Sequence, residues 1–122
     1  MVKSLLVSWW NRLPWVGGKL RVVHIVAAAD EVPDRLPPRG AVLVGSLERP
    51  TWVAFDCPCA DRHRVMLNLD SRRRPTWTMQ SSNPLSLHPS IDEFRDHKRC
   101  HYFIRGGKVQ WVPVKHRLAV LQ

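Results

Sequence analysis

Three cysteines are the residues of this chain with the clearest capacity for chemistry. Cys57 and Cys59 flank a proline in a short turn, and Cys100 stands much later, directly before His101. Thiolate and imidazole are ligands that zinc prefers, and a short turn can direct two sulfurs at one ion while a distant segment completes the tetrahedron. The clustering predicts a zinc site made by Cys57, Cys59, Cys100 and His101. The alternative is that the cysteines are small buried hydrophobic residues without a metal.

The fourth ligand of this site is open from the residues alone. Successive residues of a strand point to opposite faces, so Cys100 and His101 cannot both reach one ion from a regular strand. Either the chain is still in a turn at Cys100, or another histidine binds with it. His97 is one rival because it lies three residues before Cys100, and His63 is a second because it follows Cys59 by four residues.

A hydroxyl and an imidazole stand close together in the segment from His88 to Ser90. A serine nucleophile needs a base within hydrogen-bond reach, so Ser90 and His88 are candidate catalytic residues. The competing interpretation is structural. Ser90 can be the N-cap of a helix, with Glu93 three residues later completing a capping box.

Length and composition restrict the class of protein. The chain has 122 residues, of which 44% are hydrophobic, and we expect a single zinc-binding domain over residues 1–122. An odd number of cysteines argues against a disulfide framework and predicts a reduced, cytoplasmic protein.

The formal charge of +9 should attract polyanions or an acidic partner, but the basic residues are scattered apart from Arg72–Arg74, so we expect at most weak, nonspecific nucleic-acid binding. We expect neither a signal peptide nor membrane association.

The elements that must position these residues are mostly strands. Residues 1–18 are expected to hold a short amphipathic helix rich in tryptophan, and residues 20–114 a β-rich core. The predicted fold is mainly β in the α+β class: a small antiparallel sheet or partial barrel with a short N-terminal helix and a zinc-bound loop. A two-residue Gly106-Gly107 turn marks the clearest hairpin. The expected strands cover residues 20–27, 41–44, 51–55, 65–69, 76–79, 85–87, 102–105 and 108–112.

Several short motifs, taken in order, carry a family resemblance over roughly residues 24 to 111. They are Val32-Pro33-Asp34, Cys57-Pro58-Cys59, the segment from Leu87 to Ile91, the segment from His101 to Ile104, and the segment from Gly107 to Trp111. Together they resemble a small bacterial zinc-binding domain family of unknown function. Its members are encoded beside ubiquitin-like modifiers and ThiF-type activating and conjugating enzymes in antiviral operons.

This sequence departs from the family pattern near the cysteines. Members often continue Gly-Cys-Gly after the first cysteines, where this chain has Ala60-Asp61-Arg62, and the later family cysteine falls at Lys98. Cys100 stands where the family commonly has serine. Cys100 can therefore replace the lost ligand from two residues away.

The resemblance implies a zinc-stabilised peptidase that trims a ubiquitin-like modifier or removes it from targets. Its partners would be the modifier, its conjugates and the activating and conjugating enzymes. The alternative is a non-enzymatic module with structural zinc that binds a protein or nucleic acid through its basic surface. Three ligands and a bound water would make the zinc catalytic, whereas four closed ligands would make it structural.

Overall fold

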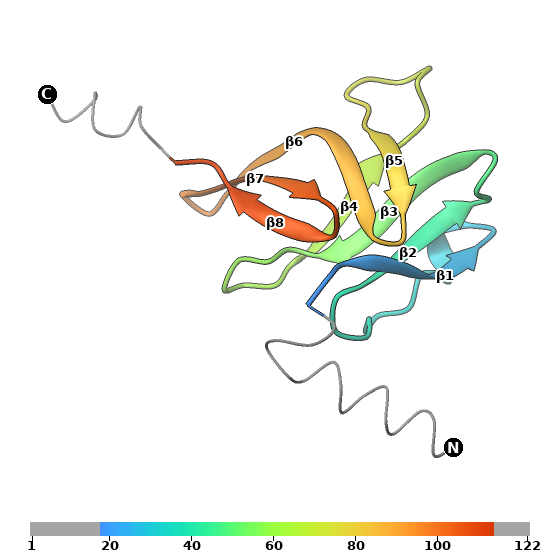
Figure 1. Cartoon of the computed structure of the whole chain (residues 1–122), viewed down its shortest axis with the longest axis horizontal. Coiled ribbons are helices and arrows are strands. Elements are labelled where there is room, and N and C mark those ends of the chain that lie inside the picture. The colour runs from blue at the N-terminus through green and yellow to red at the C-terminus, as the bar shows by residue number, and fades with distance from the viewer. Residues whose placement is uncertain (1–17, 114–122) are drawn as a thin grey trace, which may run out of the picture.

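Residues 18–113 are described by the structure, a computed structural model, and they form two sheets of four strands each (Figure 1). The one helix among these residues is a short 3-10 helix, η1, at Ala29–Glu31. The strands, in chain order, are β1 (Arg21–Val26), β2 (Gly40–Gly45), β3 (Pro50–Asp56), β4 (Arg64–Asn68), β5 (Thr78–Ser82), β6 (Leu85–Arg95), β7 (Lys98–Arg105) and β8 (Lys108–Trp111).

Each sheet keeps its strands in chain order, β1-β2-β3-β4 in the first and β5-β6-β7-β8 in the second. All neighbouring pairs are antiparallel except β1 and β2, which run parallel. A parallel pair needs a crossover connection, and residues 27–39 supply it. Val32 and Leu36 of this connection pack against Val42 and Val44, so the crossover covers one face of the first sheet.

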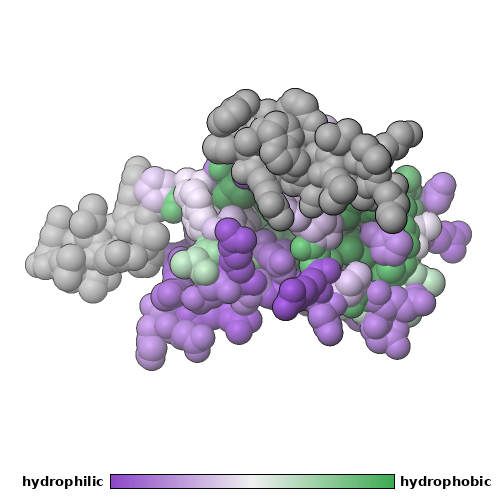
Figure 2. Space-filling model, turned by 90° about the horizontal axis from the view of Figure 1, so that it is seen from below, coloured by the Kyte–Doolittle hydropathy of each residue, from purple (hydrophilic) through white to green (hydrophobic). Residues whose placement is uncertain are grey.

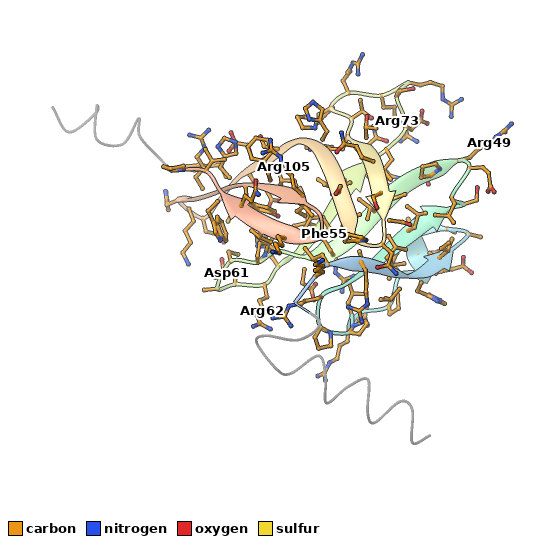
Figure 3. All side chains as sticks on the ribbon, in the orientation of Figure 1. Arg49, Phe55, Asp61, Arg62, Arg73 and Arg105 are labelled. Atoms are coloured by element: carbon orange, nitrogen blue, oxygen red, sulfur yellow. The ribbon has the colours of Figure 1, made fainter. Side chains whose placement is uncertain are left out.

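The opposite face of the first sheet packs against the second sheet, and the main core lies between them. Figure 3 shows Phe55 in this position, between the two layers. Alternation along the strands explains the arrangement, because every second residue of β7 points inward: Cys100, Tyr102 and Ile104 are buried in this core. Polar residues cover much of the outer surface, and Figure 2 shows hydrophilic side chains gathered over one half of the visible face.

Backbone hydrogen bonds join the two sheets at one side. The Leu20 amide donates to the Gly107 carbonyl, the Leu85 amide donates to the Leu20 carbonyl, and the Gly107 amide donates to the Leu85 carbonyl. Gly107 has a φ of 78°, and a Cβ there would lie 2.7 Å from the Lys19 Cβ. Only glycine fits this corner, where the β7–β8 turn meets the chain that enters β1.

The expected fold class is wrong in two respects. The described residues are nearly all β rather than α+β, and they form two packed sheets, one of them mixed, rather than one small antiparallel sheet. The helix expected within residues 1–18 falls almost entirely outside the described residues, as does the C-terminal segment from residue 114. The helix-cap interpretation of Ser90 is also wrong, because β6 continues through Ser90 and its residues Ile91–Arg95 pair with β7.

Candidate active site and cysteine cluster

Ser90 lies at an irregular point of β6. The pairing of β6 with β7 changes register between Leu87 and Ile91, so Ser90 is set apart from the regular ladder on either side. The Trp77 indole Nε1 donates a hydrogen bond of 3.2 Å to the Ser90 carbonyl oxygen. The Trp77 amide in turn donates to the Asn68 carbonyl, which connects this segment to β4. Trp77 therefore links the backbone that carries the hydroxyl to β4.

The imidazole of His101 faces this hydroxyl. Ser90 Oγ and His101 Nε2 are 3.0 Å apart, and both residues are half-buried. His101 belongs to β7, and its carbonyl accepts a hydrogen bond from the Val112 amide just beyond β8. A hydroxyl within hydrogen-bond distance of an imidazole nitrogen has the geometry that general-base activation of a nucleophile requires.

His88, the other residue proposed from the sequence as catalytic, is placed differently. It is exposed and lies opposite Thr78 in the β5–β6 pairing. Within residues 18–113 the structure has no hydrogen bond between His88 and Ser90. The sequence predicted His88 as the partner of Ser90. In the structure the partner is His101, on the neighbouring strand β7.

The three cysteines meet at the other face of the same strands. The Sγ atoms of Cys57, Cys59 and Cys100 all lie within 4.8 Å of one another, so the three thiols could hold a metal ion. Cys57 and Cys100 are buried, and Cys59 is partly exposed. The Cys-Pro-Cys turn directly follows β3, and the Cys57 amide donates to the His63 carbonyl, which closes the loop between β3 and β4.

His63 is the histidine beside this cluster. Its Nδ1 is 3.5 Å from Cys59 Sγ, and its Nε2 is 2.6 Å from Glu93 Oε1. Two ligands of a tetrahedral zinc, one sulfur and one nitrogen, are separated by roughly 3.6 Å. A carboxylate on the second nitrogen is the arrangement that orients a metal-binding imidazole. His101, the ligand predicted first, does not belong to any of the clusters that could hold a metal among the described residues.

The thiols of the cluster differ in acidity. Burial raises the pKa of Cys57 to about 12 and also raises the pKa of Cys100. Burial acts on Cys59 in the same direction, but hydrogen bonds from the Cys57 thiol and from the Arg62 and Asp61 backbone lower its pKa to about 7. The hydrogen bond to Glu93 raises the pKa of His63. Cys59 is therefore the thiol that gives up its proton most readily.

Asp61 and Asp92 are carboxylates near these residues, and Asp61 lies close enough to Cys59 and His63 to form a further group that could hold a metal. Both oxygens of Asp92 accept hydrogen bonds from the Arg99 guanidinium, and Asp61 forms an ion pair with Lys98. His97 is exposed in the turn between β6 and β7, where its φ is 66°.

Comparison with known families matches residues 28–112 to the bacterial ubiquitination-like system serine protease family (BubE). The chain belongs to this family. The match extends over most of the chain and includes Ser90, His101 and all three cysteines. The BubE description confirms the bacterial ubiquitination-like context that the resemblance implied and specifies a serine protease. Neither curated proteins nor solved structures gave a significant match. Among residues 18–113, no helix has the length and apolar character needed to cross a membrane.

Proposed function

We propose that this protein is a serine peptidase that processes a ubiquitin-like modifier or removes it from conjugates, with Ser90 as nucleophile and His101 as general base. The observation that carries the proposal is the distance of 3.0 Å between Ser90 Oγ and His101 Nε2. The BubE family description supports the reaction class and the pathway. His88, the partner of Ser90 expected from the sequence, is less suited, since it is exposed and has no hydrogen bond to Ser90 among the described residues.

The chemistry follows from the two side chains. His101 Nε2 takes the proton as Ser90 Oγ attacks the carbonyl carbon of the scissile amide, and the amine leaves after receiving that proton. Water then hydrolyses the acyl ester, with His101 again taking and returning the proton. Trp77 holds the Ser90 carbonyl, so it acts as a positioning residue that fixes the backbone beneath the nucleophile.

The cysteine cluster fits a structural zinc site. Cys57, Cys59 and Cys100 would supply three thiolates and His63 Nδ1 the fourth ligand, with Glu93 orienting the imidazole. Four protein ligands would give a closed shell, and such a zinc contributes stability rather than hydrolytic chemistry. Because Cys100 and Glu93 belong to β7 and β6, the ion would fix the two strands that carry His101 and Ser90.

Labelling with a fluorophosphonate tests the nucleophile without knowledge of the substrate. We expect the wild-type protein to form one adduct on Ser90, located by peptide mass spectrometry, and Ser90→Ala to form none. Ser81→Ala is the matched control, because Ser81 is a half-buried strand serine outside the site. Labelling of Ser90→Ala at the wild-type rate would overturn the assignment.

The substrate is tested with a ubiquitin-like protein of the bacterial ubiquitination-like system that the family description names. We expect loss of a C-terminal extension, or release of the modifier from a conjugate, measured by intact mass. Ser90→Ala should bind the same modifier without cleaving it. Binding by the wild-type protein with no cleavage in the presence of zinc would instead favour a non-enzymatic role.

A further inference from the structure

A cavity of about 300 Å³ lies between β4, the loop that follows β4 and the part of β6 after Ser90. Its walls are mostly apolar, and two arginines stand among the lining residues. The residues that matter here are Trp52, Met66, Trp77, Ile91, Arg73 and Arg74. We call it the Trp52–Trp77 pocket.

The Trp52–Trp77 pocket borders the segment that carries Ser90, and neither Ser90 nor His101 itself lines it. Trp77 forms part of its wall and also donates the hydrogen bond to the Ser90 carbonyl. Ile91 and Asp92, which follow Ser90 directly, line it as well. A peptide whose scissile carbonyl lies at Ser90 Oγ would therefore place a neighbouring side chain at this pocket.

The pocket lies between two strand edges that lack a neighbouring strand. β4 is the last strand of the first sheet, and the part of β6 beyond His88 pairs with β7 alone. Consecutive residues of both strands line the pocket, Val65–Asn68 on one side and Ile91–Glu93 on the other. Because consecutive residues alternate between faces, it is the edge of each strand that borders the cavity. A strand edge can bind an extended peptide through main-chain hydrogen bonds.

The charge at the pocket favours an acidic peptide. The carboxylates of Asp92 and Glu93 are engaged by Arg99 and His63. Arg73 extends from the loop between β4 and β5 (Figure 3), where its guanidinium lies 5.8 Å from the centre of the Trp52 ring and 4.0 Å from Asp70. Arg74 lines the same cavity and forms no ion pair with the described residues. Arg74 is therefore the lining charge that no carboxylate of the described residues pairs with, and it places a positive charge at the rim of an apolar interior.

We propose that the Trp52–Trp77 pocket binds an extended segment of the peptide substrate and takes a large apolar side chain that stands next to an acidic residue. This inference rests on the proposed peptidase function and names the class of sequence that the site selects. The tryptophan walls bury the apolar side chain, Arg74 attracts the acidic neighbour, and the strand edges hold the main chain.

Peptide binding to the Ser90→Ala variant tests the pocket without turnover. The probes are fluorescein-labelled decapeptides with a central Leu or Phe flanked by Asp and Glu, compared by anisotropy with versions in which the apolar residue is Ser or the acids are Lys. We expect each replacement to weaken binding by about tenfold or more. Equal binding of all peptides, or no binding at millimolar concentration, would overturn the proposal.

A second experiment changes the pocket instead of the peptide. Met66→Glu places a carboxylate on the wall, and we expect it to weaken binding of the apolar-acidic peptide by about tenfold or more. The matched control is Val23→Glu, since Met66 and Val23 are strand residues of similar exposure, 38% and 39%, and Val23 does not line the pocket. Undiminished binding by Met66→Glu would contradict the proposal. Fluorophosphonate labelling of Ser90 in the wild-type protein is measured alongside, so labelled Ser90 without peptide selectivity would be a failure of the pocket and not of the nucleophile.

Discussion

Cys100 and His101 are neighbours in β7 and point to opposite faces of the second sheet. Cys100 lies inward with Cys57 and Cys59, whereas His101 lies outward with its Nε2 on Ser90 Oγ. One regular strand therefore serves two sites. A shift of one residue in the pairing of β6 with β7 would exchange the faces and disrupt both sites at once.

This arrangement predicts that two histidines are separable by mutation. His63→Ala should reduce bound zinc well below one ion per chain, because it removes the proposed fourth ligand. His101→Ala should retain zinc but lose fluorophosphonate labelling of Ser90 by about a hundredfold or more. Metal content by plasma mass spectrometry and labelling by intact mass give the two measurements on the same preparations.

His88→Ala is the control for this comparison, and it should retain both zinc and labelling since His88 is exposed and apart from both sites. If a His101→Ala protein remains folded but loses its zinc, His101 is a zinc ligand. That result would contradict the assignment of His63 as the fourth ligand.

Zinc binding should release protons in a pH-dependent manner. Burial keeps Cys57, with a pKa of about 12, and Cys100 protonated at neutral pH in the metal-free protein, whereas Cys59, with a pKa of about 7, is largely ionised at pH 8. Zinc binds thiolates, so we expect about two protons to leave the thiols per ion at pH 8, and the affinity to fall as the pH is lowered. Calorimetry in buffers of different ionisation enthalpy counts the protons. An affinity independent of pH between 6 and 8 would exclude thiolate ligation.

Local patterns were sufficient to predict most of the strands. β2, β3, β4 and the β7–β8 hairpin follow from runs of alternating or β-branched residues and from the Gly106-Gly107 turn, and their observed bounds differ by a few residues at most. β5 is displaced, because it was expected at residues 76–79 and lies at Thr78–Ser82. β6 differs most. Only its first residues, Leu85–Leu87, were expected as a strand, because Pro89 and the capping pattern that begins at Ser90 interrupt the alternation.

The partners in both sites, His63 beside the cysteines and His101 beside Ser90, are set by contacts between distant segments, which a local sequence pattern does not specify. The cysteines were grouped by residue type, and alternation already indicated that Cys100 and His101 face different ways. Which histidine accompanies the cysteines is decided by the loop that returns His63 to the Cys-Pro-Cys turn. Similarly, Ser90 meets His101 through the register of β6 against β7, which the short motif around Ser90 does not specify.

The indole of Trp77 should contribute to the reactivity of Ser90. Trp77→Phe keeps an aromatic ring but removes the Nε1 donor to the Ser90 carbonyl, so the nucleophile is held less firmly. A single hydrogen bond contributes about 0.5–1.5 kcal/mol, and we expect the rate of fluorophosphonate labelling to fall about threefold to tenfold. Trp52→Phe is the matched control, because Trp52 lines the same pocket without bonding to Ser90. Equal rates for the two variants would show that the hydrogen bond does not position Ser90.

Gly107 should be more sensitive to substitution than Gly106, the other glycine of the β7–β8 turn. Gly106 and Gly107 both have positive φ, 58° and 78°, so alanine at either position is strained by about 1 kcal/mol. A Cβ on Gly106 meets nothing within 4 Å, whereas a Cβ on Gly107 would lie 2.9 Å from the Leu20 carbonyl oxygen and disturb the hydrogen bonds that join the sheets. We expect Gly107→Ala to lower the free energy of unfolding by about 2–4 kcal/mol and Gly106→Ala by about 1 kcal/mol, measured by urea denaturation. Equal losses would mean that the turn conformation, rather than the contact with Leu20, determines the requirement for glycine.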